Sequence, residues 1–342
     1  MQVVLVTPAP PASRAGNRNT AVRWARLLRQ IGHRVRVCTE WHPATDDPLE
    51  ARAPADLMLA LHARRSHPSI MRFREACPRR PLVLALTGTD IYRDIIDDPD
   101  AQQSLRVADS LVVLQRCAIE ELPPALHART FVVHQSAPAR RRTRPLQRSF
   151  EVCVVGHLRE EKDPLLAARA LSLLPASRGS GLPLRVTQVG RALDPSLEHE
   201  ARLAMAADTR YRWLGEVTPG RARALIARAG AMVISSRMEG GANVVSEAIA
   251  AGTPVIASHI PGNLGLLGSD WPATFPVGDA SALAVLLARV AAEPAFVERL
   301  RAAIGARAWI VDPGQEQAAL ATAIRAAVAS STAGRPLAPT NR

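Results

Sequence analysis

Residues 235–247, Ser-Ser-Arg-Met-Glu-Gly-Gly-Ala-Asn-Val-Val-Ser-Glu, carry the residue types in this chain that are best suited to chemistry. They follow a short apolar run and precede a helical run, which predicts a loop between a buried parallel strand and a helix. In an open α/β sheet, ligands bind at this carboxyl edge. Gly240 and Gly241 allow a ligand close to the backbone, and Asn243 is predicted to cap a helix whose N-terminus attracts phosphate.

Two carboxylates, Glu239 and Glu247, frame this loop. Taken singly, each is better explained as an ordinary acid, Glu239 in a solvated loop and Glu247 in a first helical turn. As a pair they have the spacing E-x7-E with a double glycine after the first acid, which resembles the nucleotide-sugar motif of the family 4 retaining glycosyltransferases. The resemblance implies that Glu239 contacts sugar hydroxyls, that the backbone from Gly240 to Val244 contacts the diphosphate, and that Glu247 bonds the ribose hydroxyls. Carboxylates suit both tasks because they accept two hydroxyl bonds at once.

The composition is that of a globular α/β protein with room for two domains. The chain has 342 residues, of which 47% are hydrophobic and 4% aromatic. Its first residues lack the basic and apolar regions of a signal peptide, and no run approaches the roughly 18 apolar residues of a membrane span. We therefore expect a cytoplasmic protein without stable membrane association.

The cysteines and histidines form no metal-binding or disulfide pattern. The four cysteines are widely separated without a C-x-x-C, and the nine histidines include no H-x-x-x-H. We therefore expect neither a zinc knuckle nor a disulfide framework, and a metal-dependent hydrolase is a poor candidate. No metal or other cofactor is expected.

The net charge of +12 raises the alternative of a nucleic-acid-binding protein. Of the 43 basic residues only Lys162 is lysine, and arginine, alanine and proline are abundant throughout, as expected from a coding bias. The chain also lacks aromatic interleaving and a helix-turn-helix pattern. We expect no nucleic-acid partner and assign some arginines to an anionic small substrate instead.

The first half of the chain predicts a parallel sheet. Strands are expected at residues 1–7, 35–39, 57–61, 82–86, 110–114 and 130–133, with a helix at 19–31. Because polar residues follow several of these strands, they converge on one sheet edge and predict a cleft. The candidate acceptor-binding residues there are Arg14, Gly16, Arg18, His62, Arg64, Arg65, Thr87, Thr89 and Asp90. The loop before the first helix is not G-x-G-x-x-G, which weighs against a nicotinamide dehydrogenase.

A second β/α series follows a segment rich in proline and arginine. We predict a Rossmann-like acceptor domain at residues 1–136, a solvated linker at 137–150 and a Rossmann-like nucleotide-sugar domain at 151–312. A last helix is expected at 313–330 and a disordered tail at 331–342. Two such halves resemble the GT-B fold of glycosyltransferases, in which the domains face across a cleft and the last helix crosses back to the first domain.

The segment Gly-His-Leu-Arg-Glu-Glu-Lys-Asp at 156–163 resembles a second element of that family, Gly-Arg-Leu-x-x-x-Lys-Gly, whose Arg and Lys hold the donor diphosphate. Lys162 matches the family lysine, which suggests that a compact point charge is needed there. His157 stands where the family has Arg, so either Arg159 replaces that Arg or His157 donates a proton to the phosphate. Gly190 and Gly215 either admit the nucleotide base or are plain turn glycines.

Segments 16–20, 61–66, 86–92 and 155–164 together resemble the selenosugar synthases of bacterial selenoneine biosynthesis, over residues 1 to about 330. The resemblance implies UDP-N-acetylglucosamine or UDP-glucose as donor and selenophosphate as acceptor, giving a 1-seleno-sugar. Family 4 enzymes often have a His where this chain has Thr87-Gly88-Thr89-Asp90. An anionic selenium nucleophile needs positioning more than deprotonation, and arginines provide that. The alternative is an ordinary family 4 enzyme with a hydroxyl acceptor on a lipid, glycan or metabolite.

Overall fold

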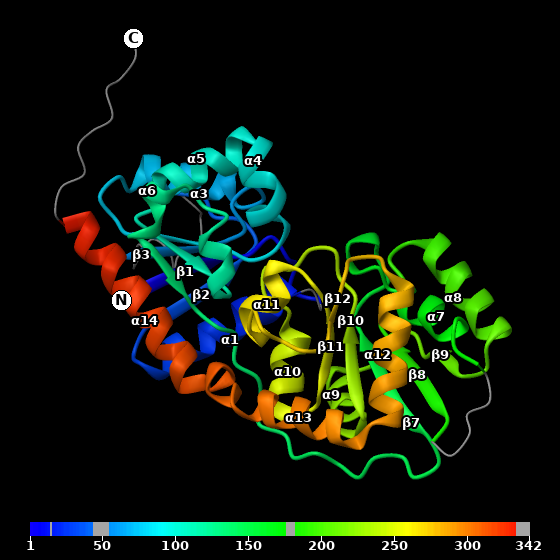
Figure 1. Ribbon diagram of the computed structural model, residues 1–342. Helices are drawn as coiled ribbons and strands as arrows, with labels where there is room; N and C mark the ends of the chain where they lie inside the picture. The colour runs from blue at the N-terminus through cyan, green and yellow to red at the C-terminus, as the bar shows by residue number, and fades with distance from the viewer. Residues whose placement is uncertain (14–15, 44–54, 176–181, 333–342) are drawn as a thin grey trace. The chain divides into compact units, whose positions relative to one another are not determined.

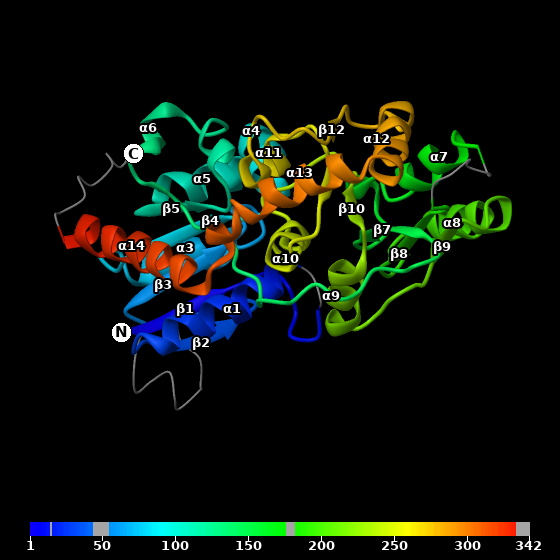
Figure 2. The same cartoon turned by 60° about the horizontal axis from the view of Figure 1, so that its bottom comes forward.

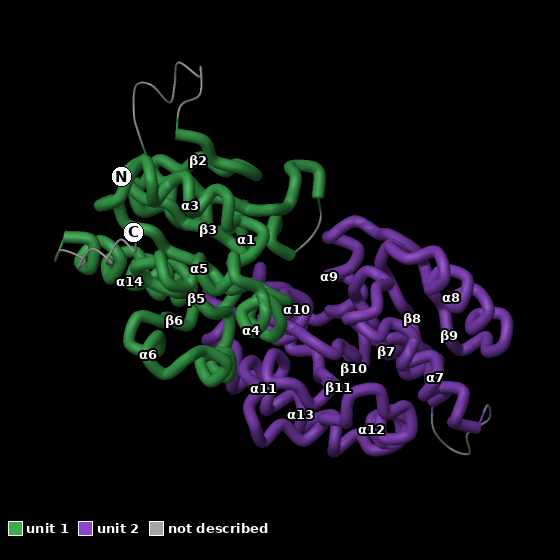
Figure 3. The backbone as a smooth tube through the Cα atoms, turned by 90° about the horizontal axis from the view of Figure 1, so that it is seen from above, with its two compact units in different colours: residues 1–135, 313–342 green, residues 136–312 purple. Residues whose placement is uncertain are grey.

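The chain folds into two compact units (Figure 3). The computed structural model describes residues 1–13, 16–43, 55–175 and 182–332. Unit 1 consists of Met1–Gln135 and Pro313–Arg342, and unit 2 of Ser136–Asp312. The chain therefore leaves unit 1, completes unit 2, and returns to unit 1 for its last helix.

Unit 1 is built on a six-stranded parallel sheet in the order β2-β1-β3-β4-β5-β6. Its central strands are runs of Val, Leu, Ala and Met that are buried on both faces, as expected for a parallel sheet covered by helices on each side. The strands are β1 (Gln2–Val6), β2 (Arg34–Cys38), β3 (Leu57–Leu61), β4 (Leu82–Leu86), β5 (Ser110–Val113) and β6 (Thr130–Val132).

Alternate residues of these strands enter two separate cores. Val3 and Leu5 face Trp24 of α1, together with apolar residues of α14, whereas Val4 and Val6 face the core under α3 and α5. Helices α1 and α14 accordingly share one face of the sheet (Figures 1 and 2). The helical elements are α1 (Gly16–Gln30), α3 (His67–Ala76), the π-helical turn η1 (Asp90–Asp94), α4 (Ile95–Asp97), α5 (Pro99–Val107), η2 (Arg116–Ile119), α6 (Pro124–His127) and α14 (Pro313–Thr332).

The return of the last helix is fixed by Glu316, which is 1% exposed. Its carboxylate accepts hydrogen bonds from Trp24 Nε1 at 2.7 Å and from Arg23 Nε at 2.9 Å, both on α1. The sequence-based expectation of a last helix that packs on the first domain is confirmed. Residues 333–342 of the predicted tail lie outside the described residues.

Unit 2 has a second six-stranded parallel sheet, in the order β12-β11-β10-β7-β8-β9. Its core combines both faces of the sheet with the inner faces of the flanking helices. The strands are β7 (Phe150–Val155), β8 (Leu184–Val189), β9 (Tyr211–Trp213), β10 (Ala231–Ile234), β11 (Val255–Ser258) and β12 (Thr274–Phe275), and the helices are η3 (Glu160–Lys162), α7 (Leu166–Ser172), α8 (Pro195–Ala207), α9 (Pro219–Arg228), α10 (Asn243–Ala251), α11 (Pro261–Leu267), α12 (Ala280–Ala292), α13 (Pro294–Gly305) and η4 (Ala308–Val311).

The arginine-rich segment before β7 departs from the expected solvated linker. Arg142 is half-buried and donates to the carbonyls of Gly252 and Ala229, at 3.3 and 3.2 Å. Gly252 and Ala229 are the C-terminal caps of α10 and α9, where the helix dipole favours a cation. Burial lowers the pKa of Arg142 from its ordinary value. The run therefore belongs to unit 2, and at least one of its arginines packs against the ends of α9 and α10.

Within the described residues, no single helix has the length and apolarity that crossing a membrane requires. Helices α12 and α13, bent by 101° at their junction, meet that criterion only as a pair.

Candidate active site

The strand order of unit 2 reverses between β7 and β10. At such a switch point the loops leave the sheet in opposite directions and open a ligand-binding crevice. Val154 of β7 pairs in register with Val233 of β10, so the two strands end at the same level. The loop after β7 carries Lys162 and the loop after β10 carries Glu239, which places the two predicted donor-site elements side by side.

Lys162 and Glu239 form a direct ion pair between Nζ and Oε1. Ser236 Oγ donates to the same carboxylate oxygen at 2.6 Å. The side chains of Lys162 and Glu239 are only 22% and 10% exposed, so the pair is weakly screened by solvent. Lys162, predicted to bind the diphosphate, and Glu239, predicted to bind the sugar hydroxyls, are thus paired with each other.

The backbone around this pair is also tied together. Ser235 Oγ donates to the carbonyls of Lys162 and Asp163, at 3.0 and 2.9 Å, and the Arg237 N–H donates to Glu161 O at 2.9 Å. Asp163 adopts a left-handed conformation at φ +40°, which Asp tolerates better than most residues. This turn ends η3 and fixes Lys162 against the loop after β10.

His157 and Arg159 differ in what each has available for a phosphate. The Arg191 N–H donates to His157 Nδ1 at 3.2 Å, so the neutral ring carries its proton on Nε2. Burial lowers the pKa of His157, which favours this neutral form. Arg159 is exposed, and its Nε lies 3.9 Å from Glu161 Oε2. His157 is thus a candidate hydrogen-bond donor, and which of the two replaces the family arginine stays a prediction.

Of the glycines after β7, β8 and β9, Gly190 is required by packing and Gly215 by its φ of +68°, whereas an added Cβ on Gly156 would meet open space. A Cβ on Gly190 would lie 1.8 Å from Gly156 O, and Gly190 has φ +147°, outside the range of other residues. The Gly190 N–H donates to Gly215 O at 2.8 Å. Gly156, Gly190 and Gly215 thus lie next to one another at the carboxyl edge. Donor binding by Gly156, and contact of the base with the backbone of Gly190 and Gly215, stay predictions.

The start of α10 differs from the sequence-based expectation. The prediction that Asn243 caps this helix is wrong, because Asn243 is its first residue and the cap is Ala242, which offers no side-chain acceptor. Val244 and Gly241 are half-buried beside it, and Gly240 is buried. Glu247 lies in the second turn, with Oε1 3.6 Å from Arg223 Nη1 of α9. The amino end of α10 thus faces the loop of Glu239 without an acidic side chain in its first turn.

The switch point of unit 1 lies between β1 and β3. The predicted acceptor residues follow these two strands: Gly16 is the first residue of α1, Arg18 lies in its first turn, and His62, Arg64 and Arg65 follow β3. The first turn of α1 has no acidic residue. Arg14 lies outside the described residues. The sheet topology therefore gathers the predicted acceptor residues at one place, as expected for a ligand site.

Asp90 is a buried acid that holds the loops at this edge of the sheet. It is 0% exposed, and its carboxylate accepts N–H bonds from Ala63 at 3.1 Å, Thr87 at 3.1 Å and Gly88 at 2.8 Å. Asp90 thereby joins the loops after β3 and β4. This geometry gives Asp90 a positioning role, while substrate contact by Asp90, Thr87 and Thr89 stays a prediction.

Sequence reasoning missed Ser236 and Asp94. Ser236 follows β10 directly and bonds Glu239, and a hydroxyl three residues before a loop acid was the available signal. Asp94 is 5% exposed, with Oδ2 3.0 Å from Arg64 Nε. Its only sequence signal is its position four residues after Asp90, which places both carboxylates on the same side of η1.

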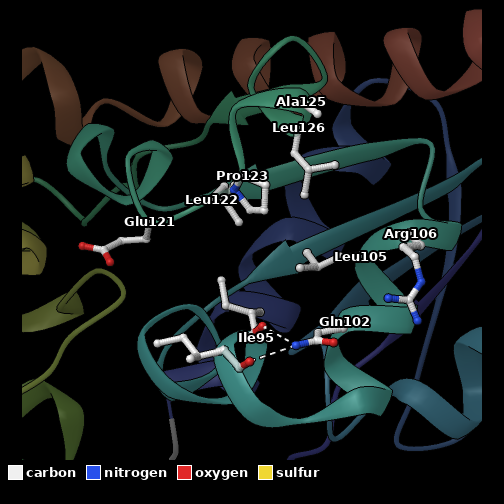
Figure 4. A pocket seen from close by; sticks show the side chains of 10 residues that line it. Ile95, Gln102, Leu105, Arg106, Glu121, Leu122, Pro123, Ala125 and Leu126 are labelled. Carbon is white, nitrogen blue, oxygen red and sulfur yellow. Dashed lines mark hydrogen bonds between the residues drawn. The ribbon is translucent and has the colours of Figure 1, made fainter.

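A separate cavity of about 540 Å³ lies in unit 1 between α4, α5 and residues 121–126 (Figure 4). Its wall is mostly apolar, and Gln102 Nε2 donates to the carbonyls of Ile95 and Ile96, at 3.3 and 2.9 Å. None of the predicted site residues lines it. In the part of the chain that the structure describes, no group of three or more His, Cys, Asp or Glu is arranged to hold a metal.

Residues 137–309 match the family model described as glycosyl transferases group 1. Comparison with curated protein sequences gives no match. Among solved structures, the chain is similar to a sucrose-phosphate synthase from Thermosynechococcus elongatus, with a TM-score of 0.75 and 16% identity over 96% of this chain and 100% of that one.

Two further solved structures are similar over almost their whole length. HepE from Anabaena in complex with UDP and glucose gives a TM-score of 0.69 and 18% identity, over 95% of this chain and 99% of HepE. An α,α-trehalose 6-phosphate synthase from Burkholderia multivorans gives 0.71 and 14%, over 96% and 99%. At these identities the likeness shows the fold, and the predicted pair of Rossmann-like domains of the GT-B type is confirmed.

Proposed function

The chain belongs to the group 1 glycosyltransferases, and we propose that it transfers the sugar of UDP-N-acetylglucosamine or UDP-glucose to selenophosphate. The products are a 1-seleno-sugar, UDP and phosphate, as in selenoneine biosynthesis. The observation that carries the donor half is the Lys162–Glu239 pair at the switch point of unit 2. The acceptor half rests on the arginines after β3 and on the sequence resemblance given above.

A nucleotide-sugar donor fits the groups around this pair. A diphosphate needs a cation and backbone N–H donors, which Lys162 and the amino end of α10 supply. The sugar hydroxyls need hydrogen-bond acceptors. The Glu239 carboxylate supplies them when Lys162 pairs with the diphosphate instead of with Glu239. HepE, which shares the fold, binds UDP and glucose in its crystal structure, and this supports a UDP-sugar as the donor.

The reaction breaks the bond between the anomeric carbon and the diphosphate oxygen, whose electron pair leaves with UDP. Negative charge grows on the diphosphate as this bond stretches, and Lys162, with His157 or Arg159, stabilises it. A selenium lone pair of selenophosphate forms the C–Se bond. Water then hydrolyses the Se–P bond, which releases phosphate and leaves the selenium on the sugar.

The acceptor side of unit 1 offers cations rather than a base. Arg65 is exposed and Arg64 is partly exposed, and both follow β3 at the switch point. An arginine binds a phosphate oxyanion through two parallel N–H bonds. His62 is 2% exposed, so it is too deeply buried to deprotonate a substrate hydroxyl directly. This arrangement favours an acceptor that arrives already ionised.

The experiment that tests the proposal is mass spectrometry of the purified chain with each UDP-sugar, with and without selenophosphate. The expected result is a sugar product with the selenium isotope pattern, formed together with stoichiometric UDP and only when selenophosphate is present. UDP release that requires a hydroxyl compound instead of selenophosphate would overturn the acceptor assignment and leave the donor assignment standing.

A pair of variants tests the arginines. Replacing Arg64 and Arg65 by Gln should raise the KM for selenophosphate without changing the KM for the UDP-sugar. Arg79→Gln is the matched control, because Arg79 is an exposed arginine that precedes β4 and so lies at the opposite edge of the same sheet. An unchanged selenophosphate KM in the double variant contradicts the assignment of these arginines.

A further inference from the structure

Three buried polar atoms meet beside the loop that follows β3 in unit 1. Asp94 Oδ2 lies 3.0 Å from Arg64 Nε and 3.8 Å from His62 Nε2. None of these three atoms has an aligned hydrogen bond among the described residues, although each is shielded from solvent. Buried polar atoms without an aligned hydrogen bond are uncommon, and each calls for an explanation such as a catalytic or ligand-binding role. In enzymes, catalytic hydrogen bonds often tighten only when the substrate is bound.

We infer that Asp94 is a positioning residue that fixes the guanidinium of Arg64 so that its two terminal nitrogens face the oxyanion of the acceptor, and that His62 in turn orients Asp94. The inference rests on the proposed function, in which Arg64 binds the acceptor.

The geometry of the guanidinium supports this assignment. Arginine has donors along two edges, one that includes Nε and one formed by the two terminal nitrogens. Asp94 and, at 3.9 Å, Asp98 both approach Nε. Among the described residues, the structure gives Arg64 no contact through its terminal nitrogens, so that edge is available for a bidentate bond to an oxyanion. Asp94 also raises the pKa of Arg64, as expected for a carboxylate that stabilises the cation.

His62 is held in one tautomer and one orientation. The Arg65 N–H donates to His62 Nδ1 at 3.4 Å, so the neutral ring carries its proton on Nε2, the nitrogen nearest Asp94. His62 has φ +76°, a left-handed conformation that non-glycine residues adopt at a cost and that is common at functional sites. A shift of the Asp94 side chain of about 1 Å would bring Nε2 within hydrogen-bonding distance.

Asp94 is itself placed by a π-helical turn. In η1, Asp90 and Asp94 both point to the loops after β3 and β4, and Asp90 is fixed there by the three backbone N–H bonds described above. Single π-helical turns are rare in proteins, and those that occur are often found at functional sites. The turn therefore delivers a buried carboxylate beneath Arg64 without exposing that carboxylate to an anionic substrate.

The test is a double-mutant cycle on the full chain. Asp94→Asn keeps the shape of the side chain and removes its charge, and we expect the KM for selenophosphate to rise by about tenfold, the loss typical of one charge-assisted bond. The KM for the UDP-sugar should not change. Arg64→Gln should have a similar effect, and Asp94→Asn added to Arg64→Gln should change the KM by less than about twofold, because Asp94 acts through Arg64.

Two control variants separate positioning from stability. Arg93→Gln removes an exposed arginine whose Nε lies 3.4 Å from Asp94 Oδ1, and Asp98→Asn neutralises the carboxylate 3.9 Å from Arg64 while an Asn can still cap α5. Both should leave the selenophosphate KM within about twofold of the original. Fully additive effects of Asp94→Asn and Arg64→Gln, or an unchanged KM in Asp94→Asn, overturn the inference.

A direct binding titration keeps this inference distinct from the proposed function. Inorganic phosphate is titrated into the original chain and into the Asp94→Asn and Arg64→Gln variants, and calorimetry measures the dissociation constant of phosphate for each. Weaker phosphate binding in both variants supports the positioning role even if selenium transfer is not observed. Weaker binding in Arg64→Gln alone overturns the role of Asp94 and leaves the acceptor arginine in place.

Discussion

Lys162 is the only lysine in a chain with 43 basic residues, and the structure places its ammonium group on the carboxylate of Glu239. An ammonium is a compact charge that can move from a carboxylate to a phosphate by rotation of a flexible stem. An arginine would bind the same carboxylate through a rigid fork and release it less readily. We propose that an exchange of Lys162 between Glu239 and a phosphate is the reason for a lysine at this position of an arginine-rich sequence.

This predicts that Lys162→Arg and Lys162→Met both lower kcat, by about 10²- to 10³-fold for Lys162→Met, the range found when one group that stabilises transition-state charge is removed. Lys162→Arg should be intermediate, because it keeps the charge but not the geometry. Steady-state kinetics of UDP release provide the measurement. Full activity in Lys162→Arg would show that any cation suffices.

At the scale of elements, the loop of Glu239 is held from the other side by the start of α11. A Cβ on Gly262 would lie 1.9 Å from Glu239 O, closer than any real contact, so α11 approaches this loop only because residue 262 is glycine. Ser258 Oγ donates to Ser236 O at 2.5 Å, and Asn263 Nδ2 donates to Ser258 O at 3.0 Å. The loop is therefore supported by β11 and α11 together.

Gly262→Ala should displace the Glu239 loop and raise the KM for the UDP-sugar, with an expected loss of stability of about 1 to 3 kcal/mol from overpacking. Gly305→Ala is the control, since Gly305 lies in α13 with no atom within 4 Å of its added Cβ and should be neutral or slightly stabilising. Urea unfolding and donor kinetics of both variants give the comparison. Equal behaviour of the two would contradict the packing argument.

The strands and loops that carry the donor and acceptor sites could be predicted from the sequence, whereas most of their side-chain contacts could not. The strand Ala231–Ile234 and the glycine loop after it are specified by neighbours in the sequence, namely an apolar run followed by turn residues. The Asn243 cap was wrong because the helix begins one residue earlier than its composition suggests, and helix ends shift easily by a residue. Asp94 was missed because only tertiary packing buries an acid that looks solvated in the sequence.

At the scale of the whole molecule, the C-terminal helix α14 returns to unit 1 and packs on α1. Glu316 is buried and receives hydrogen bonds from Trp24 and Arg23 of α1. The next residue, Gln317, is half-buried and donates one hydrogen bond to the Leu27 carbonyl, also on α1. Truncating a buried partner leaves Arg23 without its carboxylate in a partly buried place. Truncating the half-buried, uncharged amide of Gln317 removes one neutral hydrogen bond.

Glu316→Ala should therefore lower the free energy of unfolding by about 3 to 5 kcal/mol, the usual cost of breaking a buried ion pair. Gln317→Ala, the matched control one residue along, should cost no more than about 1 kcal/mol. Chemical denaturation followed by tryptophan fluorescence, to which Trp24 contributes, provides the measurement. A loss below about 1 kcal/mol in Glu316→Ala would mean that α14 is held by its apolar face alone.

The pH dependence of stability involves both units, because burial lowers the pKa values of His62 and His134 in unit 1 and of His157 in unit 2. In the unfolded chain these histidines regain an ordinary pKa of about 6.5, so the unfolded state binds more protons than the folded state below that pH. Stability is then complete above pH 6.5 and falls as the pH drops towards the lowered folded values. The limiting slope is about 1.4 kcal/mol per pH unit for each group.

Urea unfolding between pH 5 and pH 7.5 measures this slope above the range in which carboxylates titrate. His157→Gln removes one titrating group while keeping an acceptor for the Arg191 N–H, and should make the slope shallower without moving the plateau above pH 6.5 by more than about 1 kcal/mol. An unfolding free energy that stays constant, or increases, as the pH falls from 6.5 to 5 would mean that these histidines are protonated in the folded protein.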